Sequence, residues 1–434
     1  MEHANMEYAK MSKEQLSDLL SEQYVTFNRY KNLELSYDLT RGKPCRDQLD
    51  LSNDMVSRKY LKGFNSISNQ EVRNYGVLDG IPEAKQLMAE MMGVGTDEIV
   101  VCGNSSLNLM YDMLVRFMLF GTGGNGSSGG SEPWTKQGKI KWLCPVPGYD
   151  RHFLVTEKLG FEMINVPLTG DGPDMDLVEE LVKDPAVKGM WMVPKYSNPT
   201  GEVFSDAKIR RLAAMKTAAP DFRIMCDDAY TVHFLGDAPA KQLNLLDACK
   251  EAGNPERVFL FGSTSKITFP GSGISAVCGS IANIKYLLSY LTVQTIGYDK
   301  INQLRHARFL KDYKGIIAHM KRHAEILRPK FAAVDKILTN ELEGLGILTW
   351  THPDGGYFIS IDTLPGCASA VVAKAKECGV KFTPAGSTYP RKNDPEDRNI
   401  RIAPTLPPPE ELEAAIKILC VCVKICSIEK LLAE

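Results

Sequence analysis

Short apolar runs alternate with longer amphipathic stretches along most of the chain. Seven runs rich in β-branched residues are predicted to be strands, at residues 98–102, 139–146, 162–166, 189–193, 223–226, 258–261 and 276–281. Most are apolar almost throughout, which is typical of parallel strands covered on both faces. Helical periodicity is found at residues 107–120, 177–183, 206–218 and 283–290. This alternation predicts an α/β fold with a mostly parallel, seven-stranded sheet covered by helices.

The two ends of the chain have a different pattern. A polar helical stretch, 12–30, opens the chain, and a long helical stretch from about Lys311 precedes short strands at 347–350 and 357–361. We expect these ends to form a smaller α+β domain. The predicted organisation is an N-terminal segment, 1–58, that belongs to the small domain, a large domain, 59–312, and a small C-terminal domain, 313–434.

Composition and charge are those of an ordinary globular protein. The 434 residues are 44% hydrophobic and 24% charged, and the net charge is -2. These values argue against a disordered chain, and the balanced charge argues against nucleic acid as a partner. We therefore expect small-molecule chemistry.

Two observations predict a cytoplasmic protein without a membrane partner. The best apolar runs are interrupted by Arg116, Lys417 and Lys424, so none reaches the ~18 residues that cross a bilayer, and the first residues lack the apolar region of a signal peptide. The eleven cysteines form an odd, scattered set, which favours reduced thiols over a disulfide framework. Cys422 and Cys426 are expected to lie in a helical core.

Two other patterns are better explained without a dinucleotide or a metal. The segment 121–130 contains a literal G-x-G-x-x-G at Gly121, Gly123 and Gly126. It follows an amphipathic helix instead of a strand, so we interpret it as a surface loop. His319 and His323 have the spacing of a helical metal pair, but only Met, Lys and Arg lie between them. A solvated helix face is favoured, and no metal is expected.

Candidate chemistry lies at the predicted strand ends, where α/β sheets bind their ligands. Lys266 follows the strand 258–261, and burial there would lower its pKa and make the amine a nucleophile toward an aldehyde. Asp227 and Asp228 follow the strand 223–226. Adjacent strand residues point to opposite faces, so one carboxylate can enter a site while the other turns away.

Two further strand ends carry small polar motifs. Asn198 begins an Asn-Pro-Thr-Gly turn, and Ser105 and Ser106 lie between a strand and a helix. Hydroxyls and backbone N–H groups at a helix start can hold a phosphate. Taken alone, each motif also fits a plain turn or a helix N-cap, so their combination and order carry the argument.

In this order the motifs resemble those of the fold-type I aminotransferases, enzymes that use pyridoxal 5′-phosphate (PLP). The resemblance spans most of the chain and includes Tyr75 in Asn-Tyr-Gly-Val-Leu-Asp-Gly, Tyr149 in Pro-Val-Pro-Gly-Tyr and Arg401 in Asn-Ile-Arg-Ile-Ala-Pro. Thr-Arg-Gly-Lys-Pro and Ser-Thr-Ser-Lys-Ile-Thr are similar to the Ic subgroup of aspartate aminotransferases. The resemblance implies the fold of a fold-type I PLP-dependent transferase.

The resemblance also implies roles for individual residues. Lys266 would form the internal aldimine with PLP and then move a proton between the substrate Cα and C4′. Asp227 would pair with the pyridinium nitrogen, and Tyr230 and Asn198 would hydrogen-bond the 3′ oxygen. The other cofactor contacts would be Tyr149, stacked on the ring, and a phosphate site made by Ser105, Ser106 and Ser263 of this chain and Tyr75 of the second subunit of a homodimer.

The implied reaction is a ping-pong transfer of an amino group from L-aspartate, or a similar acidic amino acid, to 2-oxoglutarate. Arg401 would hold the substrate α-carboxylate through two parallel hydrogen bonds, next to Asn198. Gly42 would let the chain close over the bound amino acid. Three unranked candidates for binding a distal carboxylate are Arg41, Lys43 and Lys195.

One departure from the family pattern concerns the phosphate. Most fold-type I relatives have an arginine shortly beyond the aldimine lysine, whereas Ile-Thr-Phe-Pro-Gly-Ser-Gly-Ile-Ser follows Lys266 here. Ser272 or Ser275 would then act as a neutral donor, and the helix N-terminus would balance more of the charge. We predict that Ser272→Ala weakens retention of PLP.

The same motifs also serve aromatic and kynurenine aminotransferases and PLP-dependent lyases, which the sequence does not separate. A ligand-sensing transcription regulator is an alternative from a different class. It would need a DNA-binding domain ahead of the fold, and the residues before Tyr75 already carry Arg41-Gly-Lys-Pro. This placement, together with the net charge, disfavours the regulator.

Overall fold

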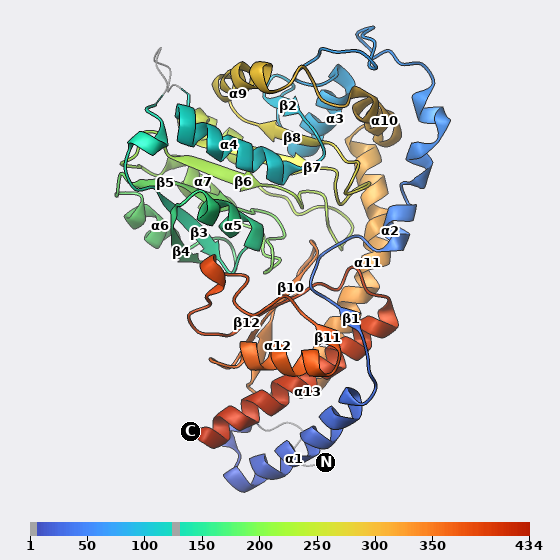
Figure 1. The fold of residues 1–434 in the computed structure, drawn as a ribbon, viewed down its shortest axis with the longest axis vertical. Coiled ribbons are helices and arrows are strands. Elements are labelled where there is room, and N and C mark those ends of the chain that lie inside the picture. The colour runs from blue at the N-terminus through green and yellow to red at the C-terminus, as the bar shows by residue number, and fades with distance from the viewer. Residues whose placement is uncertain (1–6, 124–130) are drawn as a thin grey trace.

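The computed structural model describes residues 7–123 and 131–434, with a wide upper part around one sheet and a narrower lower part (Figure 1). The upper sheet has seven strands in the order β2-β8-β7-β6-β5-β3-β4. Neighbours from β4 to β7 pair in parallel, and β8 runs antiparallel to β7 and β2. The predicted sheet is confirmed. Its strands are β2 (Ile99–Val101), β3 (Lys141–Val146), β4 (Glu162–Pro167), β5 (Val187–Met192), β6 (Arg223–Asp227), β7 (Val258–Ser263) and β8 (Ser275–Cys278).

Helices cover both faces of this sheet, and each face has its own buried apolar cluster. On one face the cluster includes Met113, Phe153 and Leu287, and its helices are α4 (Ser106–Phe120), α5 (Asp150–Lys158) and α9 (Ile281–Gln294). The helices on the other face are α3 (Pro82–Met92), α6 (Met175–Leu181), α7 (Asp206–Ala214) and α8 (Leu245–Glu251). Burial from both sides is the reason that these strands are apolar throughout.

Two predicted elements end earlier than the sequence suggested. The strand predicted at 276–281 stops at Cys278 because the Ser280 hydroxyl accepts a hydrogen bond from Asn283 N and caps α9. The helix predicted at 206–218 stops at Ala214, because Met215 takes a non-helical conformation. Of the glycine-rich segment 121–130, residues 124–130 lie outside the described residues.

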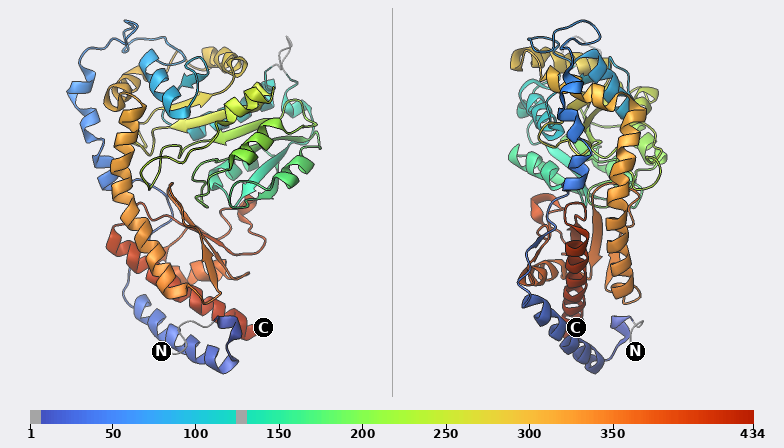
Figure 2. Two further views of the ribbon diagram at one scale, coloured as in Figure 1. Left: turned by 180° about the vertical axis from the view of Figure 1, so that it is seen from behind. Right: turned by 90° about the vertical axis from the view of Figure 1, so that its right-hand side faces the viewer.

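The lower part brings the two ends of the chain together. Helix α1 packs along α13, and strand β1 pairs in parallel with β11 (Figures 1 and 2). A three-stranded antiparallel sheet, β12-β10-β9, lies beside them. These elements are α1 (Lys13–Lys31), β1 (Tyr37–Asp38), β9 (Leu348–Trp350), β10 (Ile359–Thr363), α12 (Ala368–Glu377), β11 (Val380–Lys381), β12 (Asn399–Ile402) and α13 (Pro409–Ala433).

One long helix links the two parts along one side of the molecule, and two shorter helices pack beside it. The longest, α11 (Tyr313–Leu342), reaches from the upper sheet to α13, and Figure 2 shows it as a continuous rod. Helix α10 (Lys300–Leu310) precedes it, and the short α2 (Arg46–Asp50) packs on it. The division of the chain at residues 58 and 312 stays a prediction.

Burial supports one expectation and overturns another. All eleven cysteines are free and buried, and the core position expected for Cys422 and Cys426 is confirmed. The solvated helix face predicted for His319 and His323 is wrong, because both imidazoles are buried where α11 packs behind the segment that carries Lys266.

Within the described residues, no cluster of three or more metal-ligating side chains occurs. None of the helices described has the length and apolar character needed to cross a membrane.

Candidate active site

The carboxyl ends of β5, β6 and β7 and the start of α4 surround a cavity of about 200 Å³. This is the sheet edge at which the sequence predicted ligand binding. Eight of the predicted site residues line it, namely Ser105, Ser106, Tyr149, Asn198, Asp227, Tyr230, Ser263 and Lys266. The structure therefore brings together, from five separate stretches of sequence, the amine, carboxylate, amide, phenols and hydroxyls of the predicted site.

Lys266 extends from the turn after β7 into this cavity. Its Nζ lies 4.9 Å from the centroid of the Tyr230 ring and 6.0 Å from that of Tyr357. Ring faces attract a cation, so both rings hold the amine in place. Tyr357 lies in the turn before β10, so a residue of the lower part helps to orient an amine of the upper part.

Asp227 is the last residue of β6 and is buried. Its Oδ2 accepts a hydrogen bond of 3.0 Å from Nε2 of His152, whose ring stacks on Trp191 at 4.4 Å. Its Oδ1 is equally buried and has no hydrogen-bond partner among the described residues. A buried carboxylate oxygen without a partner costs about 1–3 kcal/mol, so this atom is a place where a ligand donor would be stabilising.

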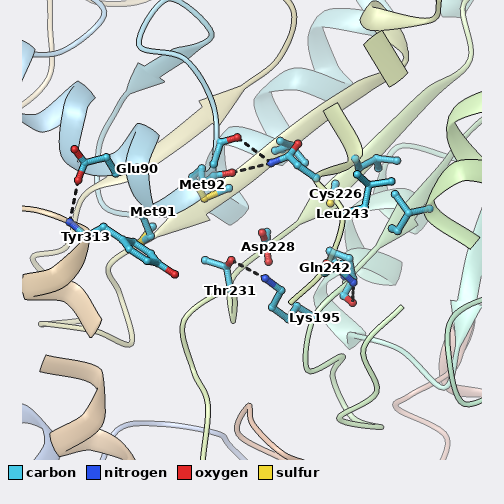
Figure 3. Close-up of a pocket in the computed structure, with 16 residues that line it drawn as sticks. Glu90, Met91, Met92, Lys195, Cys226, Asp228, Thr231, Gln242, Leu243 and Tyr313 are labelled. Atoms are coloured by element: carbon cyan, nitrogen blue, oxygen red, sulfur yellow. Dashed lines mark hydrogen bonds between the residues drawn. The ribbon is translucent and has the colours of Figure 1, made fainter. Parts of the chain in front are cut away.

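Asp228 faces the other side of the sheet, as the strand alternation predicted. It lines a separate cavity of about 200 Å³ together with Lys195, Thr231 and Gln242 (Figure 3). Lys195 Nζ donates to Thr231 Oγ1 at 3.5 Å, and burial raises the pKa of Asp228. Lys195 lines this second cavity and not the Lys266 cavity, so the structure lends no support to its binding a distal substrate carboxylate.

Arg401 lies on β12, and its guanidinium is buried against the Phe358 ring at 4.7 Å. Nη1 is 3.2 Å from Asp150 Oδ1 and 3.3 Å from Asn198 Oδ1. Nη2 donates to the Thr40 carbonyl oxygen and to Thr383 Oγ1. Its buried Nε has no partner among the described residues. Through Asn198, Arg401 borders the cavity from the side of the lower part.

Gly42 lies close to the same phenylalanine. A Cβ at this position would come within 2.5 Å of Phe358 Cζ, inside the van der Waals contact distance. A side chain here would displace the Phe358 ring, which packs against the Arg401 guanidinium. Glycine therefore lets the chain pass close to this ring.

The phenols of the site are held in their neutral form. Burial raises the pKa of Tyr149 to about 12 and also raises the pKa of Tyr230. Both hydroxyls therefore keep their protons at neutral pH and can donate hydrogen bonds. The Tyr149 ring makes an edge contact with His152, at 4.9 Å.

Several predicted residues lie outside this cavity in a single chain. Tyr75 is 81% exposed and borders a different hollow beside Tyr298 and Lys300. The Ser272 side chain is exposed. Ser275 already donates its hydroxyl to the Gly103 carbonyl oxygen at 2.6 Å, which contradicts its expected role as a free donor. Arg41 and Lys43 are exposed as well.

Three residues near the cavity were missed by the sequence analysis. His152 had no signal beyond its place near Tyr149. Ser265 lines the cavity and donates to the Asn104 carbonyl oxygen. His233 is buried edge-on against Tyr230 and Tyr357, and burial lowers its pKa to about 3, which keeps it neutral. Ser265 lies within the Ser-Thr-Ser-Lys motif that ends at Lys266, whereas His233 has no strand-end motif of its own.

The donor set fits pyridoxal 5′-phosphate. One cavity offers an amine for an aldehyde, an unpartnered buried carboxylate oxygen for a protonated ring nitrogen, and serine hydroxyls for a phosphate. Ser105 and Ser106 lie at the N-terminus of the 15-residue helix α4, where the helix dipole favours an anion, and Ser263 ends β7. Lys266 is the one cationic side chain among the described residues that line the cavity.

Comparisons with known proteins agree with this geometry. The family model described as aspartate amino-transferase matches residues 11–434. An aspartate aminotransferase of Corynebacterium glutamicum is 45% identical over 430 residues, which cover 97% of this chain and 98% of that protein. The crystal structure of an aspartate transaminase from the same species has a TM-score of 0.95 and 44% identity, and covers 98% of this chain and 100% of its own. A 2-aminoadipate transaminase of Thermus thermophilus is 25% identical over 73% of each chain.

Proposed function

Because this chain belongs to the aspartate aminotransferase family, we propose that it transfers the amino group of L-aspartate to 2-oxoglutarate, with PLP as its cofactor. The observation that carries the proposal is the convergence of Lys266, the unpartnered Oδ1 of Asp227 and the serine hydroxyls of the α4 turn on one cavity. When bound, PLP supplies an electron-withdrawing ring that accepts the electron pair released at the substrate Cα.

The cofactor would be held by residues already oriented in the structure. Asp227 Oδ1 would accept a hydrogen bond from the protonated ring nitrogen, while His152 fixes Oδ2 and so prevents the carboxylate from rotating. Tyr230 and Asn198 would hydrogen-bond the 3′ oxygen, and Tyr149 would cover the ring face. The phosphate would be held by the α4 N-terminus and its neighbouring hydroxyls, those of Ser105, Ser106 and Ser263, and in a dimer by Tyr75 of the second copy.

Lys266 would be the proton carrier. Its Nζ reaches the cavity between the Tyr230 and Tyr357 rings. It can therefore accept the proton from the substrate Cα and donate it to C4′ of the cofactor. The neutral Tyr230 hydroxyl beside it donates and does not compete for this proton. Lys266, Asp227 and Tyr230 are thus the proposed catalytic residues.

Arg401 would bind the substrate α-carboxylate. Its planar guanidinium presents paired donors, and its buried Nε has no other partner among the described residues. Asn198 already contacts Nη1 and would join the carboxylate site. Gly42 keeps the chain close above Phe358 without displacing the arginine. A substrate carboxylate would also take over the place of Asp150, which occupies Nη1 in the structure described here.

Three organisational proposals accompany this function. We propose a homodimer, because the exposed Tyr75 lies outside the cavity of its own chain and is free to complete another. We propose the division into residues 1–58 with 313–434 and residues 59–312, supported by the packing of α1 on α13. A cytoplasmic location is proposed because all eleven cysteines are free.

The test is an absorbance spectrum of the purified protein, wild type and Lys266→Ala, before and after addition of aspartate. We expect the wild type to retain PLP, to change its spectrum with aspartate and to form glutamate when 2-oxoglutarate is added, whereas Lys266→Ala binds PLP without turnover. A wild type that cannot be reconstituted with PLP contradicts the proposal. A panel of amino donors tests the substrate: preference for aromatic amino acids or kynurenine, or release of ammonia from a single substrate, would replace aspartate transamination by one of those activities.

A further inference from the structure

A buried polar cluster lies directly behind Lys266, on the side away from the cavity. It consists of Gln48 on α2, Ser52 just after it, His319 and His323 on α11, and Tyr357 before β10. We call these five residues the histidine cluster. None is more than 6% exposed, and only the Tyr357 ring approaches the Lys266 amine. Polar groups this deeply buried are costly unless they are paired.

The orientation of Gln48 is fixed by the backbone. Cys45 N donates to Gln48 Oε1 at 3.1 Å, so the amide oxygen faces Cys45 and the Nε2 group faces the cluster. Nε2 then donates to Tyr357 Oη at 2.9 Å and to His323 Nδ1 at 3.1 Å. His323 Nδ1 must be an acceptor, which leaves the ring proton on Nε2. Burial lowers the pKa of His323 to about 3, in agreement with a neutral ring.

The other side of the cluster holds two successive backbone carbonyl groups. The Tyr357 hydroxyl accepts from Gln48 and so directs its own proton to the Lys266 carbonyl oxygen, at 3.4 Å. His319 Nε2 is 2.9 Å from the Ile267 carbonyl oxygen and therefore donates to it. The Ile267 carbonyl oxygen also accepts a hydrogen bond from His323. The Nε2 atoms of His323 and His319 are 3.2 Å apart. The carbonyls of the lysine itself and of its neighbour are thus both held from behind.

The segment that supplies Gln48 also contacts the arginine of the site. The Thr40 carbonyl oxygen accepts from Arg401 Nη2 at 3.4 Å, and Gly42 lies against the Phe358 ring under the same guanidinium. Residues 40–52 therefore contact Arg401 at one end and, at the other, the side chains that hold the Lys266 segment: Gln48 contacts Tyr357 and His323, and Ser52 Oγ lies 3.2 Å from His319 Nε2.

We propose that Gln48 is a positioning residue for Lys266: it orients His323 and Tyr357 so that the carbonyls of Lys266 and Ile267 are held in place. The proposal rests on the proposed function, since it concerns the lysine that moves the proton. Lys266 must return to the same position in each half of the reaction. A backbone fixed at two consecutive carbonyls brings its amine back to one place.

Two substitutions of similar size separate positioning from simple space filling. Gln48→Met removes both donors and the acceptor. Gln48→Glu keeps the shape and the acceptor for Cys45 N but removes the donors, so His323 must move its proton to Nδ1 and the Tyr357 hydroxyl turns from the Lys266 carbonyl to the new carboxylate. If only the volume of the side chain matters, Gln48→Glu should behave like the wild type. If the direction of the hydrogen bonds from Gln48 matters, both variants should lose the positioning of Lys266 to the same extent.

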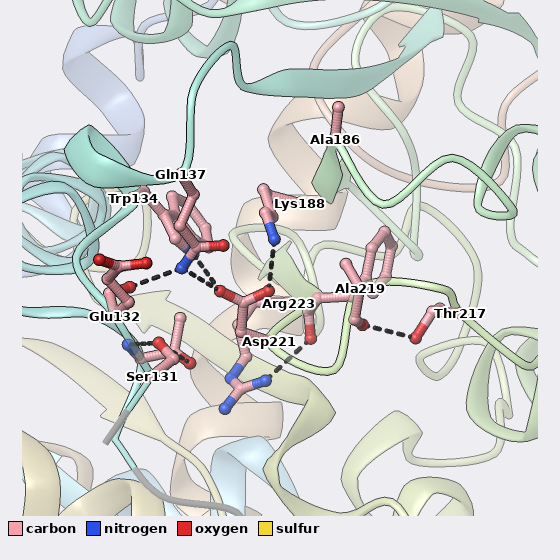
Figure 4. Close-up of polar contacts among 12 residues, drawn as sticks. Ser131, Glu132, Trp134, Gln137, Ala186, Lys188, Thr217, Ala219, Asp221 and Arg223 are labelled. Carbon is pink, nitrogen blue, oxygen red and sulfur yellow. Dashed lines mark hydrogen bonds and ion pairs between the residues drawn. The ribbon is translucent and has the colours of Figure 1, made fainter. Parts of the chain in front are cut away.

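The control is Gln137→Met at the other end of the large sheet. Gln137 Nε2 donates to Asp221 Oδ2 at 2.9 Å (Figure 4), and neither residue lines the Lys266 cavity. The Gln137→Met substitution removes a glutamine amide donor in the same way as Gln48→Met. None of the contacts of Gln137 belongs to the site. Circular dichroism and a melting curve of all three variants establish that each is folded before other measurements are made.

The first measurement uses the holoenzyme. We expect both Gln48 variants to lower kcat by about tenfold while KM for aspartate stays within about twofold, because a misplaced proton carrier slows a step without removing a substrate contact. Gln137→Met should leave both constants unchanged. Gln48 variants that match the control in kcat would overturn the positioning role, and an effect confined to KM would reassign Gln48 to substrate binding.

The second measurement needs neither cofactor nor activity. Hydrogen exchange of residues 264–268 in the PLP-free protein should accelerate by about tenfold in both Gln48 variants and not in the control, because the amides of Ile267 and Thr268 donate to the Thr264 carbonyl oxygen within the segment that the cluster holds. Unchanged exchange there overturns the proposal even if the enzyme is active. An inactive wild type with the expected exchange pattern would refute the proposed function and leave the positioning intact.

Discussion

Two buried aspartates at opposite ends of the central strand β6 differ in how completely the protein pairs them. Asp221, just before the strand, receives Lys188 Nζ at 2.8 Å on Oδ1, and Trp134 Nε1 and Gln137 Nε2 on Oδ2 (Figure 4). Asp227, at the carboxyl end, receives only His152, and its Oδ1 has no partner among the described residues. Both are nearly inaccessible to solvent.

The difference separates a stabilising carboxylate from one kept ready for a ligand. Burial alone would raise the pKa of Asp221, but hydrogen bonds from Lys188, Gln137 and Trp134 hold it below its ordinary value. Both carboxylate oxygens of Asp221 therefore have hydrogen-bond partners within the fold. The fold tolerates an incomplete one at the sheet edge where its polar motifs converge, which is the pattern expected where stability is given up for binding.

Of the substitutions that test the difference between the two aspartates, Asp227→Asn should have the largest effect, and this effect should be on activity. The amide still accepts a hydrogen bond but no longer stabilises a proton on the cofactor ring, so we expect kcat to fall by about 10³-fold, the scale of a lost preorganised electrostatic contact. The free energy of unfolding should stay the same or rise by about 1 kcal/mol, since a buried charge with an unpartnered oxygen is removed. Single-turnover kinetics and urea unfolding of the cofactor-free protein measure the two effects. Full activity in this variant would contradict the role of Asp227.

Asp221→Asn should lower the stability of the protein and leave its activity unchanged. It leaves the buried Lys188 ammonium without its counter-ion, which we expect to lower the free energy of unfolding by about 3 kcal/mol. The kcat of the folded fraction at 25 °C should not change, because no contact of Asp221 reaches the cavity. Replacing both partners, as in Lys188→Met with Asp221→Leu, should recover part of the loss. A variant as stable as the wild type would show that this pair contributes little.

Asp221, just before β6, also predicts a pH dependence of stability. The folded-state pKa of Asp221 lies below its unfolded value of about 3.9. Its contribution is therefore fully present above pH 4 and is lost as the pH falls through the folded-state pKa. Unfolding of the wild type between pH 5 and pH 2 should lose this part of its stability, and Asp221→Asn should show a shallower loss over the same range. Parallel curves for the two proteins would contradict the assignment.

The sequence predicted the parts of this comparison that are local. Lys266, Asp227 and Asn198 each follow an apolar strand within a few residues, so the shared edge of a parallel sheet was enough to bring them together. His152 and Asp227 are separated by 75 residues, and Gln48 and His323 by 275. No periodicity joins such pairs. The same long-range packing buries His319 and His323, which helical spacing alone placed on a solvated face.

The smallest expected effect concerns the phosphate, where the fold offers two serines with different placement. Ser263 lines the cavity, whereas the Ser272 side chain is exposed outside it. Loss of one hydrogen bond to a charged phosphate corresponds to about 1.5 kcal/mol at the low end, or about tenfold in affinity, so Ser263→Ala should weaken PLP binding by about that factor. Ser272→Ala, predicted from the missing arginine, should then weaken it less than Ser263→Ala does, because its hydroxyl must reach in from outside. Fluorescence titration of both cofactor-free variants measures the two constants. An equal or larger loss for Ser272→Ala would mean that this turn moves inward when the phosphate binds, and that the α4 N-terminus does not balance the anion alone.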